Sequence, residues 1–234
     1  MLGVEAYEGL TRQQSAARTL AIPAARRAGL PLQAMLKRAL DIAGAGGLLL
    51  LGLPVFVILS VLVRADGGPA FYAHERVGRG GRRFGCLKFR SMVTDSATRL
   101  EALLAQDPEA RAEWDATRKL RHDPRITWIG RFLRASSLDE LPQLINVLRG
   151  DMSLVGPRPV IAAELAAHYG AAAEHYLSVR PGITGLWQVS GRSSTSYDTR
   201  VALDVRYATN PSLREDLRIL LRTPAAVLLR RGAY

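Results

Sequence analysis

The sequence has a single cysteine, Cys86, among its 234 residues. No disulfide can therefore form within the chain, and a reducing compartment is favoured over a secreted one. The four histidines show neither HxxxH nor Cys/His spacing, so a zinc site has no support in the sequence. These absences leave open a metal ion that is held by carboxylates and phosphates.

A cleavable signal peptide is also absent, because the first basic residues are not followed by an apolar stretch with a small-residue cleavage site. Residues 1–35 are instead rich in Ala, Arg and Gln and have little apolar periodicity, which predicts a basic, poorly ordered leader. Its excess of basic over acidic side chains suits the surface of an anionic membrane.

Acidic residues are too few to balance the basic ones. The chain has 32 Lys and Arg against 21 Asp and Glu, a formal net charge of +11. Such a charge indicates an anionic partner: nucleic acid, lipid headgroups or a phosphorylated substrate. The basic residues lie among carboxylates and prolines and form no recognition helix or aromatic-interleaved strip. No nucleic acid is therefore expected as a partner.

Charge is wholly missing from residues 42–63, an apolar segment long enough to span a bilayer as a helix. Basic residues flank it on both sides, as at Lys37 and Arg64, and the positive-inside rule therefore favours both ends on one face. Pro54 removes a helical hydrogen bond near the middle. We predict a re-entrant membrane helix over residues 36–64, kinked at Pro54. An ordinary spanning helix is the alternative, since such helices also tolerate proline.

The remaining residues, 65–234, are predicted to form one cytoplasmic domain that is mostly helical and carries a small β-hairpin. The predicted fold class is α+β. Residues 71–77 and 82–90 have the composition of strands, and the glycine-rich segment 78–81 between them suits a hairpin turn. Alternation along the second strand places Lys88 and Arg90 on one face.

Apolar residues recur at helical spacing in three later segments. A helix over residues 96–120 is expected to break at Pro108. Residues 141–148 are predicted to form an amphipathic helix closed by Gly150. In the segment 213–222, interleaved leucines and arginines suit a helix at a membrane interface, although a surface helix packed on the core would show the same pattern. The candidate buried positions of the first helix are Leu100, Leu103, Leu104 and Trp114.

Two adjacent carboxylates, Asp139 and Glu140, stand at the start of the predicted helix 141–148. Free backbone N–H groups and the helix dipole stabilise an anion at such a position. A carboxylate that stays ionised there can attack phosphorus or hold a divalent metal ion. The alternative is purely structural, because Ser137 and Glu140 have the spacing of a capping box.

One arginine, Arg158, lies between two prolines, which fix the backbone on both sides of its guanidinium. A rigidly presented guanidinium is well matched to a phosphate by bidentate hydrogen bonds, and a plain surface loop is the alternative. Trp187 lies in a loop constrained by glycines and a proline. It can stack on the ring of a bound nucleotide or sugar, or it can serve as a packing anchor.

Taken together and in order, several short motifs resemble those of the bacterial sugar transferase family, the monotopic phosphoglycosyl transferases. The motifs are KRALD at 37–41, GPAF at 68–71, ERVG at 75–78, KFRSM at 88–92, SLDELPQ at 137–143, GDMSLVGPRP at 150–159 and RPGITG at 180–185. The resemblance covers roughly residues 35–234. It leaves the leader outside.

This resemblance implies transfer of a sugar 1-phosphate from a UDP-sugar to undecaprenyl phosphate at the cytoplasmic face of the inner membrane, early in exopolysaccharide or related glycan synthesis. In the family, the Asp of an Asp-Glu pair attacks the phosphorus that carries the sugar, expels UMP and forms a covalent phosphosugar-aspartate. Matched by motif, the nucleophile is Asp139. Glu140, with Asp139, would hold Mg²⁺.

The resemblance also implies roles for other residues. Arg158, Lys88 and Arg90 would contact substrate phosphates, and Asp204 matches a further acidic position. The membrane helix would be re-entrant, and anionic lipid would be a partner. The C-terminal half is most similar to galactose 1-phosphate transferases; the alternatives are a glucose 1-phosphate transferase and a non-catalytic scaffold for polysaccharide assembly. Nothing in the sequence indicates the oligomeric state.

Overall fold

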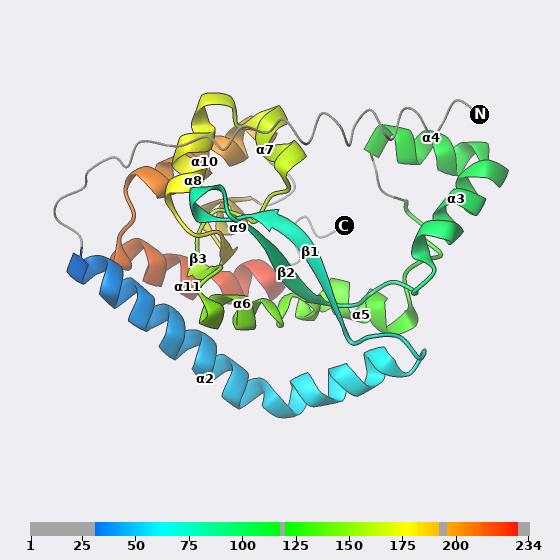
Figure 1. The fold of residues 1–234 in the computed structure, drawn as a ribbon, viewed down its shortest axis with the longest axis horizontal. Coiled ribbons are helices and arrows are strands. Elements are labelled where there is room, and N and C mark those ends of the chain that lie inside the picture. The colour runs from blue at the N-terminus through cyan, green and yellow to red at the C-terminus, as the bar shows by residue number, and fades with distance from the viewer. Residues whose placement is uncertain (1–30, 118–119, 192–195, 229–234) are drawn as a thin grey trace.

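The computed structural model describes residues 31–117, 120–191 and 196–228. Within them the chain is rich in helix and holds two small two-stranded sheets (Figure 1). This agrees with the predicted α+β class and its hairpin, whereas the second sheet is not predicted by the sequence. The expected leader, residues 1–35, lies outside the described residues up to residue 30. Residues 31–35 already belong to a helix.

The longest helix, α2 (Pro31–Arg64), contains the uncharged segment. Among the described residues it is the one helix long and apolar enough to cross a membrane, judged by length and composition. Much of its surface is not covered by the other described residues: Leu50 and Leu51 are 74% and 83% exposed. A contiguous apolar surface of this kind marks a site of contact with a membrane or another protein.

Pro54 lies inside α2, and the helix continues through it. Figure 1 shows two arms of α2 that meet at a bend in the part of the helix around this proline. Proline bends a helix because it has no N–H to donate and its ring meets the carbonyl four residues earlier. The re-entrant course of the helix through a membrane stays a prediction.

Strands β1 (Phe71–Val77) and β2 (Arg83–Phe89) form the antiparallel hairpin that the sequence predicts. A 3-10 turn, η1 (Arg79–Gly81), joins them. Gly80 and Gly81 in this turn adopt φ values of +68° and +79°. Only glycine takes up this left-handed conformation at low cost, which explains the glycine-rich turn.

The hairpin is fastened to the C-terminal arm of α2. The ring centroid of Phe89 lies 5.1 Å from that of Phe56 on α2 and 5.4 Å from that of Phe71 at the start of the hairpin. Beside these rings, Arg90 donates to the carbonyl of Val63 at 2.9 Å and forms an ion pair with Asp66. The end of the apolar helix and the base of the hairpin are therefore one packed unit.

Two helices, α3 (Ser96–Gln106) and α4 (Pro108–Thr117), occupy the region where one helix with a break at Pro108 was expected. The predicted break is confirmed, since Pro108 opens the second helix, where its missing N–H costs nothing. The predicted burial is wrong: Leu100, Leu103, Leu104 and Trp114 are only half-buried. Figure 1 shows the reason, because the pair projects from one end of the molecule.

The rest of the domain is built from short elements around a parallel strand pair, β3 (Ser153–Val155) with β4 (Gly182–Thr184). Of the predicted helix 141–148, only residues from Gln143 onward are α-helical, and Gly150 ends the helix at φ +89°, as expected. The remaining elements are α5 (Trp128–Ser136), η2 (Leu138–Glu140), α6 (Gln143–Arg149), α7 (Ala162–His168), η3 (Gly170–Ala172), α8 (Ala173–Ser178), α9 (Leu186–Ser190), α10 (Tyr197–Thr209) and α11 (Leu213–Leu228).

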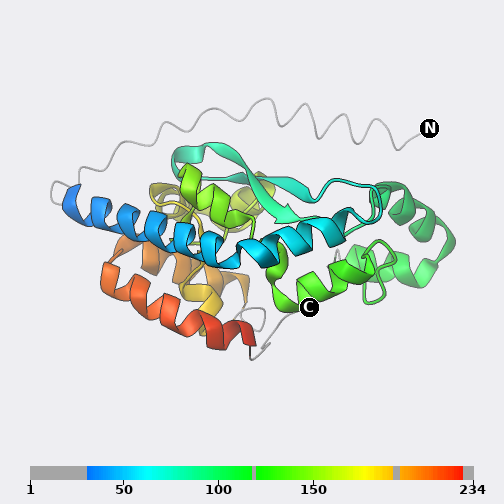
Figure 2. The same ribbon diagram turned by 90° about the horizontal axis from the view of Figure 1, so that it is seen from below.

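Exposed apolar side chains continue from α2 onto its neighbours. Figures 1 and 2 show α5, α6 and α11 running beside α2 on the same side of the molecule. Trp128 and Phe132 of α5 are 64% and 52% exposed, and Leu217 and Leu221 of α11 are 50% and 81% exposed. The predicted amphipathic stretch of α11 has an exposed face and a buried one. Its arginines and these two leucines are exposed, while Ile219 is buried against the domain.

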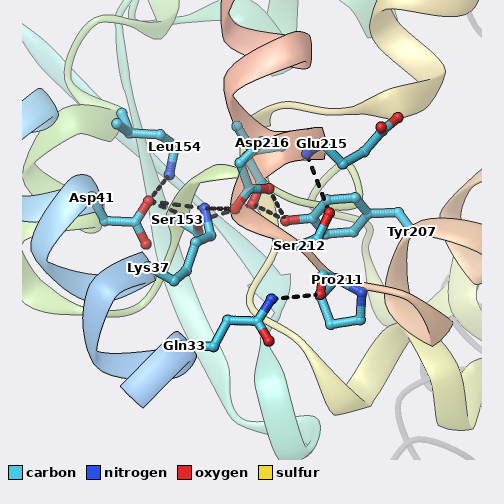
Figure 3. Close-up of polar contacts among 11 residues, drawn as sticks. Gln33, Lys37, Asp41, Ser153, Leu154, Tyr207, Pro211, Ser212, Glu215 and Asp216 are labelled. Atoms are coloured by element: carbon cyan, nitrogen blue, oxygen red, sulfur yellow. Dashed lines mark hydrogen bonds and ion pairs between the residues drawn. The ribbon is translucent and has the colours of Figure 1, made fainter. Parts of the chain in front are cut away.

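A buried polar network joins the N-terminal arm of α2 to β3 and α11 (Figure 3). Asp41, 1% exposed, accepts hydrogen bonds from the backbone N–H of Leu154 and the hydroxyl of Ser153, both at 2.9 Å. Lys37 lies 3.1 Å from Asp41 and 3.3 Å from Asp216 on α11. One ammonium therefore links two buried carboxylates from different helices.

We predict that Asp41→Ala lowers the stability of the purified protein by about 1–3 kcal/mol, because it leaves the buried N–H of Leu154 without its acceptor. The measurement is the thermal unfolding midpoint in detergent. The matched control is Glu101→Ala, which removes an exposed helical carboxylate and should change stability by no more than about 0.5 kcal/mol. Equal midpoints for the two variants would contradict the anchoring role of Asp41.

Candidate active site

Three of the predicted site residues meet in the structure. The ammonium of Lys88 on β2 lies 2.8 Å from a carboxylate oxygen of Glu140 and 3.3 Å from one of Asp139. The strand and the acidic turn are about 50 residues apart in the sequence, so this contact is made by the fold. Asp139 is 9% exposed, and its side chain keeps a narrow opening to solvent.

The Asp-Glu pair lies in the 3-10 turn η2, just ahead of α6. The preceding residue, Ser137, has φ +59° and ends α5 in the left-handed conformation. Its side chain makes no cap hydrogen bond, so the capping box that Ser137 and Glu140 could form is not present. A non-glycine residue in this conformation is strained, and such strain is typical of residues that aim functional side chains.

A buried asparagine holds the acidic turn and the strand of Lys88 in register. Asn146 of α6, 0% exposed, accepts a hydrogen bond from the N–H of Leu87 and donates one to the carbonyl of Gly85, each at 2.9 Å. The side-chain amide thus occupies the free edge of β2 in the place of another strand. It fixes Lys88 opposite η2.

The charges of the three residues are coupled. Burial raises the pKa of Asp139 above its ordinary value, and the neighbouring Glu140 adds to the rise, while Lys88 and Arg134 oppose it. Burial works to lower the pKa of Lys88, but the charges of Glu140 and Asp139 outweigh it and the pKa is raised. Lys88 therefore stays cationic beside a carboxylate that is more basic than a free aspartate.

A small pocket opens beside these residues. Arg158 lines it together with Lys88 and Glu140, so two of the residues predicted to bind phosphate lie in one pocket. The enclosed space is only ≈ 20 Å³, about the room of one water molecule. A larger ligand must therefore extend from this pocket over the open surface. Further polar side chains in its wall are Arg76, Gln143 and Gln188.

Arg90, predicted to contact phosphate, is not part of this pocket. Its side chain is 8% exposed, and its donors are bound to Asp66 and to the carbonyls of Val63, Pro69 and Met92. Alternation predicts that it lies on the face of Lys88, but Arg90 follows the end of β2. There Val63 of α2 and residues outside that helix supply acceptors for the whole guanidinium. Arg90 is a structural link to α2, and the prediction of a phosphate contact does not hold here.

Asp204, the further acidic position, lies away from Asp139 on α10. It is 2% exposed and accepts a hydrogen bond of 2.7 Å from the hydroxyl of Tyr169. Burial raises its pKa to about 6, although the Tyr169 hydrogen bond and the charges of Arg200 and Arg158 act in the opposite direction. Asp204 supports the arginine side of the pocket and does not reach the Asp-Glu pair.

Among the described residues, no group of three or more His, Cys, Asp and Glu side chains could hold a metal ion. Asp139 and Glu140 alone offer two carboxylates, which fits Mg²⁺, an ion that proteins hold by one or two carboxylates together with water and substrate phosphates. The larger cavity, ≈ 170 Å³, lies between α2 and α11 and contains none of the predicted site residues.

Sequence reasoning missed Arg76, Gln143 and Gln188. Arg76 could have been found from the pairing of the two hairpin strands. It lies opposite Phe84, and the side chains of Phe84 and Lys88 are on the same face of the hairpin. Gln143 and Gln188 lie on short helices, where no pattern separates a pocket residue from a surface one. Trp187 was predicted to stack on a ligand ring or pack; its indole lies against the guanidinium groups of Arg158 and Arg200.

We predict that Asp204→Asn becomes more stable than the wild type as the pH rises. The folded protein binds the Asp204 proton more tightly than the unfolded chain, so the wild type loses stability from about pH 4 to pH 6 and the neutral amide does not. The difference should reach up to about 3 kcal/mol above pH 6. Unfolding midpoints between pH 4.5 and 7.5 measure it. Asp198→Asn, exposed on the same helix, is the control, and a constant gap between Asp204→Asn and the wild type would refute the prediction.

Comparison with known proteins agrees with the resemblance seen in the motifs. Residues 32–230 match the model of the family described as "Bacterial sugar transferase". The chain is 58% identical over 199 residues to a UDP-galactose-lipid carrier transferase of Erwinia amylovora, and 54% identical over 199 residues to an undecaprenyl-phosphate galactose phosphotransferase of Salmonella typhimurium. In both cases 85% of this chain matches 42% of the relative, so the chain spans less than half of either relative's length.

A third relative has nearly the same extent as this chain. The exopolysaccharide production protein ExoY of Rhizobium meliloti is 50% identical over 222 residues, which cover 94% of this chain and 98% of the relative. The family model covers far more than half of the chain and includes all the residues that line the pocket. This chain belongs to the bacterial sugar transferase family.

Proposed function

We propose that this protein transfers a sugar 1-phosphate from a UDP-sugar to undecaprenyl phosphate and releases UMP. The observation that carries the proposal is the contact of Lys88 with both Asp139 and Glu140 beside Arg158. A reactive carboxylate next to fixed cations suits the transfer of a phosphoryl group, because positioning and neutralisation of charge supply most of its catalysis. The names of the relatives support the same reaction.

The proposed first step is attack of an Asp139 carboxylate oxygen on the β-phosphorus of the donor. The bond from that phosphorus to the oxygen shared with the α-phosphate breaks, UMP leaves with the electron pair, and a phosphosugar-aspartate remains. In the second step a phosphate oxygen of the lipid acceptor attacks the same phosphorus and frees Asp139. Asp139 is 9% exposed, so its carboxylate has less solvent to shed when it attacks phosphorus than an exposed one would.

The cations around Asp139 have separate tasks in this proposal. Lys88 and Arg158 neutralise the charge of the transferred phosphoryl group. Asp139 and Glu140 would hold Mg²⁺, which neutralises phosphate charge when bound. Since Lys88 now lies against both carboxylates, its ammonium would turn toward the substrate when the donor and Mg²⁺ bind.

The proposed acceptor is a lipid, and α2, α5 and α11, which run beside one another in Figures 1 and 2, all carry exposed apolar side chains. We propose that these side chains enter the membrane, with α2 re-entrant and both of its ends in the cytoplasm. Lys37 and Arg38 near one end and Arg64 at the other support this topology. The exposed basic residues would then contact anionic lipid headgroups.

We propose galactose as the sugar, in exopolysaccharide synthesis. The names of the two most similar relatives quoted above support galactose, and that of the third supports the pathway. Purified protein incubated with undecaprenyl phosphate should release UMP faster from UDP-galactose than from UDP-glucose or UDP-N-acetyl sugars. Faster release of UMP from UDP-glucose would show that glucose and not galactose is the sugar transferred, and it would leave the proposed reaction class unchanged. No release from any donor would refute the proposed function.

We predict that Asp139→Asn lowers UMP release by at least about a thousandfold, because the amide has no negative charge with which to attack phosphorus. The substitution keeps the size of the side chain, so the unfolding midpoint should stay close to that of the wild type. Asp198→Asn, on the exposed face of α10, should retain full activity. More than about a tenth of wild-type activity in Asp139→Asn would show that another group is the nucleophile.

We predict that single cysteines at residue 32 and residue 101 are both shielded from an impermeant thiol reagent in intact cells. Leu32 and Glu101 are exposed on either side of the membrane segment of α2. The native Cys86 does not compete, because it is buried and burial raises its pKa to about 11. Both variants should react once the membrane is opened. Reaction at residue 32 alone in intact cells would establish a spanning helix.

A further inference from the structure

Arg200 on α10 is buried without the partners that a buried guanidinium needs. It is 8% exposed, and its Nε and one terminal nitrogen have no hydrogen-bond partner among the described residues. Buried donors are almost always paired, because each unpaired one forfeits its bonds to water. An unpaired buried cation therefore points to a ligand that is bound during function.

Aromatic rings lie beside the guanidinium of Arg200, but they do not satisfy its hydrogen-bond donors. The guanidinium carbon lies 4.9 Å from the ring centre of Trp187 and 4.8 Å from that of Tyr197. Aromatic faces attract a cation but accept no strong hydrogen bonds. The nearby carboxylate, Asp204, is bound to the hydroxyl of Tyr169 instead. The ring contacts therefore leave these two buried donors without a hydrogen-bond partner among the described residues.

One indole connects Arg200 to the active-site pocket. The guanidinium carbon of Arg158, a pocket residue, lies 5.7 Å from the ring centre of the same Trp187. The next residue of α9, Gln188, lines the pocket and has a buried oxygen without a partner among the described residues. Two like charges share one aromatic ring, and an anion between them would relieve their repulsion.

We infer that Arg200 is a second phosphate-binding arginine of the donor site and that it binds the phosphate on the nucleoside side of the donor. This rests on the proposed function, which places the β-phosphate beside Asp139 and Arg158. The α-phosphate is one bridging oxygen away and carries its own charge. Both guanidinium groups lie against the indole of Trp187, so each can take one phosphate of the diphosphate. The product UMP keeps the α-phosphate and should be held by Arg200.

The test compares the binding of UMP and uridine to the purified full-length chain in detergent by calorimetry. Arg200→Gln should weaken UMP binding about tenfold or more, as expected for the loss of charge-assisted hydrogen bonds, and should leave uridine binding within about twofold. Arg200→Gln should therefore lose most of the preference for UMP over uridine. The control is Arg206→Gln, an exposed arginine on the same helix, which should keep the wild-type preference.

Arg200→Lys tests the inference if the glutamine variant unfolds, since it keeps the charge between the rings and loses the planar fork. Its KM for the UDP-sugar should rise at least about fivefold while its KM for undecaprenyl phosphate stays constant. A structural role would change both constants, or kcat alone. A UMP preference in Arg200→Gln equal to that of Arg206→Gln overturns the inference, as does an unchanged donor KM in Arg200→Lys. A wild type that neither binds nor releases UMP would refute the proposed function itself.

Discussion

The hydrogen bonds and ion pair of Asp41 are the constraint on which the rest of the structure depends. A carboxylate that is 1% exposed inside an apolar helix is stable only where partners surround it, and here they come from Lys37 and from the first residues of β3. The interaction therefore fixes both the rotation of α2 about its axis and its position along that axis relative to β3. Close packing follows, since a side chain at Gly44 would meet Leu154 at 2.6 Å.

The two arms of α2 position residues of the candidate active site through different contacts. The N-terminal arm holds β3, and the chain leads from β3 directly to Arg158. The C-terminal arm ends in the carbonyl of Val63, to which Arg90 donates, and Lys88 lies two residues before Arg90, on β2. Both cations that the proposed reaction uses are thus positioned from one apolar helix, which explains why the apolar segment and the candidate active site belong to one fold.

Sequence reasoning succeeded where a pattern is local. The hairpin follows from a glycine turn between two β-like runs, and Pro108 opens a new helix as its missing N–H requires. It failed where the partner is distant: alternation put Arg90 on the face of Lys88 but could not show that Asp66 would bind it. The three-residue strands β3 and β4 are too short to carry any period. Leu100 and its neighbours look buried because helical periodicity shows which face is apolar and not how much of the protein covers it.

The buried amide of Asn146 has a consequence for how this hairpin tolerates change over evolution. An open strand edge invites pairing with another chain, and a slip by one residue would turn Lys88 to the opposite face. Asn146 occupies that edge between Gly85 and Leu87 and so prevents both events from within the chain. The position of β2 is therefore set in the middle of the strand and not at the hairpin tip. A change of loop length between Gly78 and Arg82 would then leave the ammonium of Lys88 in place, whereas replacement of Asn146 would remove both hydrogen bonds that hold β2.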